Sequence, residues 1–199
     1  MLPLLTIPGS YGRGSDGSAM GINDSGVIVG FSGDEGFTAQ ATLWRGGRVE
    51  NLGSLTAFGV SEAVDINNQD VVVGDRDFHA FIWTATSGGV DINPVGADES
   101  SARAINDRNW AVGYIARRRF EAEDDRAALW LPNADAVNLN SLVDFSYSTL
   151  DRLSVAEAIN EFGEIVGTGT GRDGLAHGFC SPRYPKFKPG FACCLDWCW

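Results

Sequence analysis

The sequence has no apolar run long enough to cross a membrane as a helix, and it is short of positive charge. It carries 15 Lys and Arg residues against 26 Asp and Glu, which gives a net charge of −11. A chain this acidic repels phosphate backbones, which argues against general nucleic-acid binding. Its 199 residues suffice to bury a core without a metal or a disulfide, and an aromatic content of 11% excludes wholesale disorder.

Catalytic motifs are also missing. There is no G-x-S-x-G elbow, no H-E-x-x-H pair and no EF-hand loop, and neither Ser nor Cys recurs beside a histidine. The segment GTGTGRDG (167–174) imitates a phosphate-binding loop, but it lies between two expected strands with no helix after it. The sequence therefore predicts no catalytic, cofactor-binding or metal-binding residue.

Cysteine and lysine occur only in the last twenty residues. The cysteine spacings fit no C-x-x-C pair, which argues against a metal site and leaves disulfides or a loosely attached tail as alternatives. The four cysteines are Cys180, Cys193, Cys194 and Cys198. We divide the chain into a repeat domain, residues 1–181, and a foreign Cys- and Trp-rich tail, residues 182–199. The start, MLPLLTIPGS, lacks the basic region of a signal peptide.

Four internal repeats organise the rest of the chain. Five positions are identical in all of them: an Asn, the Ile before it, the Ala four residues before it, and the Val and Gly six and seven residues after it. The repeats are SAMGINDSGVIVG (18–30), EAVDINNQDVVVG (62–74), SARAINDRNWAVG (101–113) and VAEAINEFGEIVG (155–167).

Each repeat reads as a β-hairpin whose turn follows the Asn. The third residue after the Asn is of a type that tolerates a left-handed backbone, and the Asn side chain can bond its own turn's amides. We expect the recurring Ile and Val to face the core, and the recurring Gly to mark a close approach of two backbones. The residues three after the Asn are Gly26, Asp70, Asn109 and Gly163.

A third strand follows each hairpin, and a fourth follows in three repeats. The third strands are expected at 39–44, 79–83, 126–130 and 176–180, and the fourth at 49–55, 89–95 and 135–142. Residues 2–7 (LPLLTI) stand where they could supply the missing fourth strand of the last repeat. We therefore predict an all-β, propeller-like fold of four blades in which the N-terminal strand completes the last blade. A piece of a larger propeller and an open stack of units are the alternatives.

The pattern A-x-x-I-N-x-x-G-x-I-V-G, followed by H-A-F-x-W and an L-G-x-L strand, resembles the HAF repeat of extracellular, mostly bacterial proteins. The H-A-F triplet stands at His79-Ala80-Phe81, and His177-Gly178-Phe179 is its variant in the last repeat. The resemblance covers about residues 1–181 and implies an exported or cell-surface protein. It carries over no catalytic residue, and the apolar anchor of a C-terminal sorting tail is missing here.

For several residues of types that can bind a ligand or catalyse a reaction, we expect a structural role. His79 and His177 share one repeat position and are expected to bond a neighbouring blade. A second repeat position is occupied by Trp44, Trp83 and Trp130. We expect these side chains to pack in the core and not to form a platform on which a sugar stacks. The run Arg117–Arg119 is followed by acids, so we expect a solvated loop. The glycosylation sequon at Asn23 lies in a repeat turn and is incidental.

The sequence thus predicts a non-catalytic module that binds a glycan or a protein through its inter-strand loops. Insertions at 31–38 and 114–125, between second and third strands, place functional variation there. A glycan-processing hydrolase is the alternative, because SGDEGFT (32–38) resembles the Asp-box of sialidase-type propellers and acids are abundant. A structural spacer is a third possibility. The sequence indicates neither the ligand nor the oligomeric state.

Overall fold

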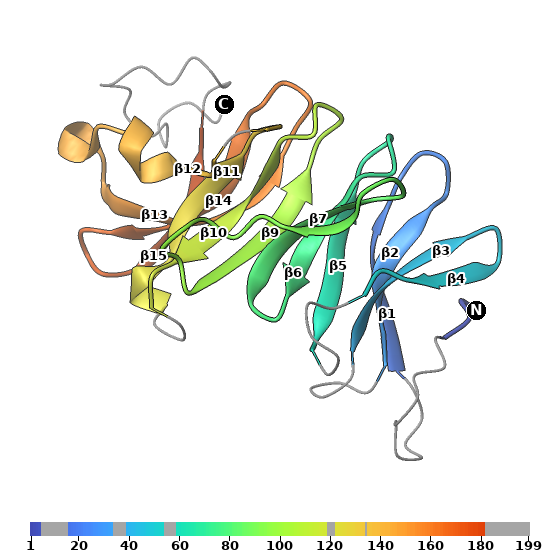
Figure 1. The fold of residues 1–199 in the computed structure, drawn as a ribbon. Coiled ribbons are helices and arrows are strands. Elements are labelled where there is room, and N and C mark those ends of the chain that lie inside the picture. The colour runs from blue at the N-terminus through green and yellow to red at the C-terminus, as the bar shows by residue number, and fades with distance from the viewer. Residues whose placement is uncertain (5–15, 34–38, 54–58, 119–121, 134, 182–199) are drawn as a thin grey trace. The chain divides into compact units, whose positions relative to one another are not determined.

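The computed structural model describes residues 1–4, 16–33, 39–53, 59–118, 122–133 and 135–181. These residues form four antiparallel sheets and no α-helix, which confirms the predicted all-β class (Figure 1). None of their helical segments is long and apolar enough to span a membrane. The chain divides into two compact units, Met1–Ile92 and Asn93–Trp199, and each contains two of the sheets.

Each sheet joins strands in the order in which they occur in the chain. The first sheet consists of β1 (Asp16–Ile22), β2 (Ile28–Gly33), β3 (Gln40–Arg45) and β4 (Arg48–Asn51). The second consists of β5 (Ser61–Ile66), β6 (Val72–Arg76), β7 (His79–Thr84) and β8 (Gly88–Asp91).

The third sheet consists of β9 (Glu99–Ile105), β10 (Ala111–Ala116), β11 (Arg126–Trp130) and β12 (Val137–Asn138). The last has three described strands, β13 (Leu150–Ile159), β14 (Ile165–Gly171) and β15 (Ala176–Cys180). Three short 3-10 helices complete the second unit: η1 (Ala122–Asp124), η2 (Leu139–Leu142) and η3 (Phe145–Tyr147).

The recurring Asn shapes the hairpin turn in every repeat, as predicted. Its side-chain oxygen accepts hydrogen bonds from the backbone N–H groups two and four residues later, over 2.9–3.1 Å. The third residue after it has a φ between 58° and 79° in all four turns. A residue tolerant of the left-handed region is therefore needed there.

The recurring Gly lies opposite a β-bulge. In each hairpin the register shifts by one residue just after the recurring Ala, which pairs directly with that Gly. A Cβ on the glycine would stand 1.9–2.0 Å from a carbonyl oxygen of the first strand. This confirms the expected close approach, and it explains why only glycine occupies the position. The glycines are Gly30, Gly74, Gly113 and Gly167.

The apolar core of each unit lies between its two sheets. In the first unit β5 lies against β1, β2 and β3 (Figure 1), so Ile66 joins Val29 and Leu43 in one buried cluster. In the second unit β13 lies against β9, β10 and β11, and Leu153 joins Val112 and Leu129. Within each unit, the first strand of the second repeat thus packs on the sheet of the first.

The fourth strands are shorter than predicted. β4 and β8 end by residue 51 and residue 91, and β12 has two residues before the chain enters η2. The cause at η2 is Asn138, whose side chain accepts a hydrogen bond from Asn140 N (3.0 Å) and so caps a helical turn.

The predicted N-terminal strand is also not found in the part of it that the structure describes. Residues 2–4 form no strand, and Pro3 O accepts a hydrogen bond from Trp44 Nε1 (2.6 Å) of the first sheet. Residues 5–7 lie outside the described residues. Closure of four blades into a propeller by residues 2–7 therefore stays a prediction.

The prediction of a core position is wrong for two residues. Ile22 of the first repeat and Val166 of the last are exposed, although Ile66 and Val29, their counterparts elsewhere, are buried. The reason is that the β-bulge and the turn fix only where these side chains point. Their burial depends on a neighbouring sheet.

Candidate functional site

The recurring Asn does more than shape its own turn. Asn23 Nδ2 donates to Asn67 O (3.1 Å), and Asn106 Nδ2 donates to Asn160 O (3.0 Å). The side chain therefore joins the turns of two successive repeats in each unit. Asn23, the sequon residue, is buried with its amide engaged in this way, which supports the view that the sequon is incidental.

The two histidines bond within their own sheets, so the prediction of a bond to a neighbouring blade is wrong. His79 Nδ1 lies 2.9 Å from Asp91 on the adjacent strand β8. His177 Nε2 lies 3.0 Å from Asp173, in the turn that precedes its own strand. Hydrogen bonds from Leu175 N and His177 lower the pKa of Asp173. Both histidines are surface partners of a carboxylate on the same sheet.

The tryptophans and the glycine-rich segment singled out in the sequence have structural roles. Trp44, Trp83 and Trp130 are buried, as expected for core packing. Segment 167–174 forms the end of β14 and a turn, with no helix after it. Arg117 and Arg118 are exposed, as predicted, whereas Arg119 and the Asp-box positions 34–38 lie outside the described residues, as do Cys193, Cys194 and Cys198.

The insertion of the third repeat, in contrast, borders a cleft of about 380 Å³. One wall is the turn 94–97, and the other is the end of β10 with the loop that follows it. The lining residues are Pro94, Val95, Gly96, Ala97, Ile115, Ala116, Arg117, Asp124, Arg126 and Asn138. This is one of the two insertions in which the sequence placed functional variation.

Hydrogen bonds hold both walls of the cleft. Arg117 N donates to the Asp124 carboxylate (2.9 Å), while Arg126 Nη1 donates to the carbonyl oxygens of Glu123 (3.0 Å) and Asp125 (2.8 Å). The opposite turn is closed by Ala97 N donating to Pro94 O (3.1 Å). The cleft is therefore preformed, and its volume falls in the range of small-molecule sites.

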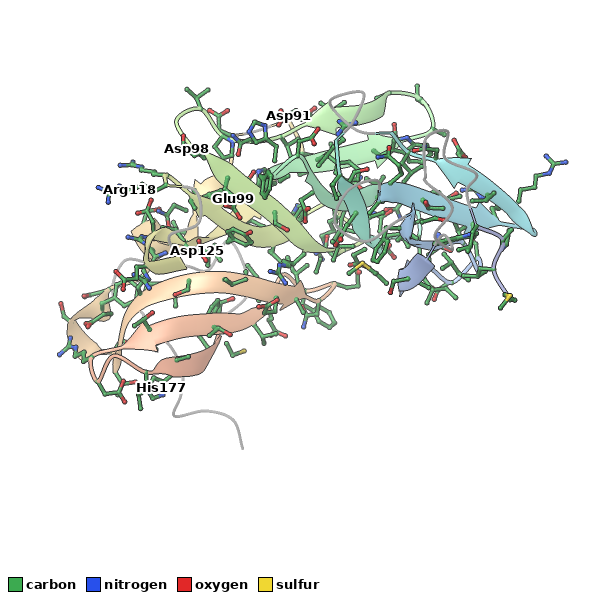
Figure 2. All side chains as sticks on the ribbon, turned by 90° about the horizontal axis from the view of Figure 1, so that it is seen from below. Asp91, Asp98, Glu99, Arg118, Asp125 and His177 are labelled. Atoms are coloured by element: carbon green, nitrogen blue, oxygen red, sulfur yellow. The ribbon has the colours of Figure 1, made fainter. Side chains whose placement is uncertain are left out.

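A pair of carboxyl groups lies next to the cleft. Burial, and then the charge of Glu99, raise the pKa of Asp125 above its ordinary value. Glu99 accepts a hydrogen bond from the Tyr114 hydroxyl (2.7 Å). Figure 2 labels Glu99, at the start of β9, and Asp125, in the connection just before β11, while His177 lies on the last sheet. Asp125 separates the cleft residues Asp124 and Arg126 but does not itself line the cleft.

We expect Asp125→Asn to raise the melting temperature at about pH 7 and to leave it unchanged at about pH 3. Because the folded state raises the pKa of Asp125, ionising this carboxyl group weakens folding once the pH exceeds its unfolded pKa. At low pH both states are protonated and the effect disappears. Thermal denaturation at the two pH values measures it.

Asp144→Asn is the matched control for that experiment, with the opposite sign. Hydrogen bonds from Ser146 lower the pKa of Asp144, so its ionised form stabilises the fold above its unfolded pKa. The control is expected to lower the melting temperature at about pH 7. A decrease for Asp125→Asn at neutral pH would contradict the assigned environment.

Among the described residues, no group of three His, Cys, Asp or Glu side chains is placed to hold a metal ion. Comparisons of the chain with family models, with curated proteins and with solved structures found no match. The cleft and the repeats are therefore the features of this chain that bear on its function.

Proposed function

We propose that this chain is a non-catalytic binding module that takes a glycan in the loops between its strands, with the cleft of the third repeat as its site. The observation that carries the proposal is the preformed cleft of about 380 Å³ in a repeat insertion. The polar groups of the recurring Asn residues, in contrast, form hydrogen bonds within turns and between successive repeats.

The lining of the cleft suits a sugar. Arg117, Asp124 and Asn138 supply planar polar groups that can bond hydroxyls, while Val95 and Ile115 supply apolar surface for the C–H faces of a ring. Arg126 is paired with Asp124 at 3.8 Å, which leaves the Arg117 guanidinium as an exposed positive charge at the rim. A sugar that bears a carboxylate fits this charge best.

A thermal-shift screen with neutral and uronic-acid oligosaccharides tests the proposal, because a ligand of the native state raises the melting temperature. The fitting sugar is then titrated by calorimetry against Arg117→Ala. Losing one charge-assisted hydrogen bond is expected to weaken binding about tenfold or more.

Arg48→Ala, an exposed arginine on β4 of the first unit, is the matched control and should leave the affinity unchanged. If no oligosaccharide shifts the melting temperature, the glycan is the wrong ligand. Equal losses for the two arginine variants would show that binding follows overall charge and that the cleft is not the site.

A glycan-processing hydrolase is the second candidate, and the raised pKa of Asp125 beside Glu99 favours it. Such enzymes need one carboxyl group held protonated and a second one ionised. Chromogenic glycosides assayed between about pH 4 and 8 test this activity. If a glycoside is cleaved and Asp125→Asn abolishes this turnover, the chain is an enzyme and the proposal of a non-catalytic binding module is wrong.

We also propose that the chain is an extracellular protein of the HAF-repeat type and that its sheets are blades of a propeller-like array. The quoted repeat motifs support the first point. The second is supported by the four consecutive sheets and by the packing of β5 and β13 on the preceding sheet.

A further inference from the structure

The first sheet exposes positions that the second and third repeats bury. Ile22 is 65% exposed, whereas Ile66 and Ile105 are 4% and 6% exposed. Ala19 is exposed as well, although its counterparts Ala63 and Ala102 are fully buried. An apolar groove of about 430 Å³ adjoins this face, lined by Met1, Leu2, Leu4, Gly17, Ser18, Ala19 and Trp44.

The last sheet also exposes positions that the other repeats bury. Val166 is 44% exposed, although the valines at its position in the other repeats are fully buried. Gly178 is exposed where the other repeats have a fully buried Ala. The buried counterparts are Val29, Val73 and Val112 for the first position and Ala41, Ala80 and Ala127 for the second.

The packing inside each unit shows which kind of surface covers the equivalent faces of the other sheets. In the first unit, the face of β5 that carries Ile66 is covered by the sheet that carries Val29. In the second unit, β13 lies in the same way on the sheet that carries Val112. The free face of β1 is therefore shaped for a sheet like the last one, and the free face of the last sheet for a strand like β1.

The turns carry the same complementarity. Asn23 and Asn106 each donate a side-chain N–H to the next repeat's Asn carbonyl oxygen. Asn160, in the last repeat, is exposed, and its amide donates to the Glu164 carboxylate in its own turn (2.6 Å). The Asn that would extend the series thus uses its donor locally.

From these faces we propose that the last sheet of one molecule receives the first sheet of a second copy of this chain. Ile22 and Val166 are exposed among the described residues, and a second copy supplies the matching partner for each face. The contact is head to tail: Ile22 and Ala19 of one copy lie on the Val166 and Gly178 face of the other. The proposal does not rest on the ligand cleft.

Sedimentation and light scattering over a range of protein concentrations test this contact on the full chain. The wild-type chain is expected to associate as its concentration rises. Ile22→Lys removes one face and Val166→Lys the other, and each is expected to raise the dissociation constant about tenfold or more. Both side chains are exposed, so the variants should fold.

Mixing the two variants gives the decisive result. Each retains the face that the other lacks, so an equimolar mixture should form heterodimers at concentrations where each variant alone is still monomeric. Val90→Lys, an exposed valine on β8, is the control and should associate like the wild type. A wild-type chain that is monomeric at every concentration, or a mixture without dimers, would overturn the proposal.

Discussion

Gly167→Ala is expected to destabilise the second unit by about 2–3 kcal/mol, because the new Cβ would stand 2.0 Å from Val155 O and 2.7 Å from the Phe179 ring. The carbonyl belongs to the paired strand, so the hairpin can only open to admit the methyl group. For a unit of this size, the melting temperature should fall by roughly 10 °C or more. Thermal denaturation of the full chain measures the change.

Gly178→Ala is the matched control in the same sheet. A Cβ there would meet nothing closer than Gly167 O at 3.9 Å, and the other three repeats already have Ala at this position. We expect a change within about 0.5 kcal/mol. Equal effects of the two substitutions would show that loss of glycine flexibility, and not the close approach at the bulge, determines stability.

Asn106→Asp is expected to cost about 2–3 kcal/mol at neutral pH. The substitution keeps an oxygen for the N–H groups of Arg108 and Trp110 but replaces the donor that bonds Asn160 O. A buried carboxylate then faces a carbonyl oxygen, since Asn106 is only 2% exposed. Denaturant unfolding at neutral pH measures the loss, which should shrink in acid as the new carboxyl group gains a proton.

Asn160→Asp separates the contact between repeats from the turn itself. Its side chain makes the same two turn bonds, but its amide donates only to the half-buried Glu164 carboxylate among the described residues. We expect a loss of about 1 kcal/mol or less, from the repulsion between two carboxylates near the surface. Similar losses at Asn106 and Asn160 would mean that the contact between repeats contributes nothing measurable.

The hairpins could be predicted from the sequence because their determinants are local. The Asn, the turn residue with positive φ and the Gly opposite the bulge lie within a stretch of eight residues. The bond from Asn23 to the next repeat could not be predicted, since a side-chain amide has two donors and sequence does not show which backbone lies beside it. The prediction that Ile22 is buried is wrong for the same reason, because the burial of this side chain depends on a neighbouring sheet.

The candidate cleft was predicted only as a region. An insertion at 114–125 indicated where variation lies, but the opposite wall is the turn 94–97, whose nearness to β10 follows from the folded sheet alone. The hairpin turn at Asp77-Phe78 also escaped prediction. Both residues have positive φ, 53° and 72°, whereas the two-residue turn between β3 and β4, at a different place in its repeat, has Gly46-Gly47. A bulky aromatic residue gives no turn signal.

The strand order described above bears on how the chain folds. All hydrogen-bonded strand pairs among the described residues join strands that are consecutive in sequence, so each sheet forms by closing short loops at small entropic cost. The longer-range step is the docking of β5 on the first sheet and of β13 on the third. A chain built in this order can complete each sheet during synthesis, and within each unit the second sheet can settle on a finished predecessor.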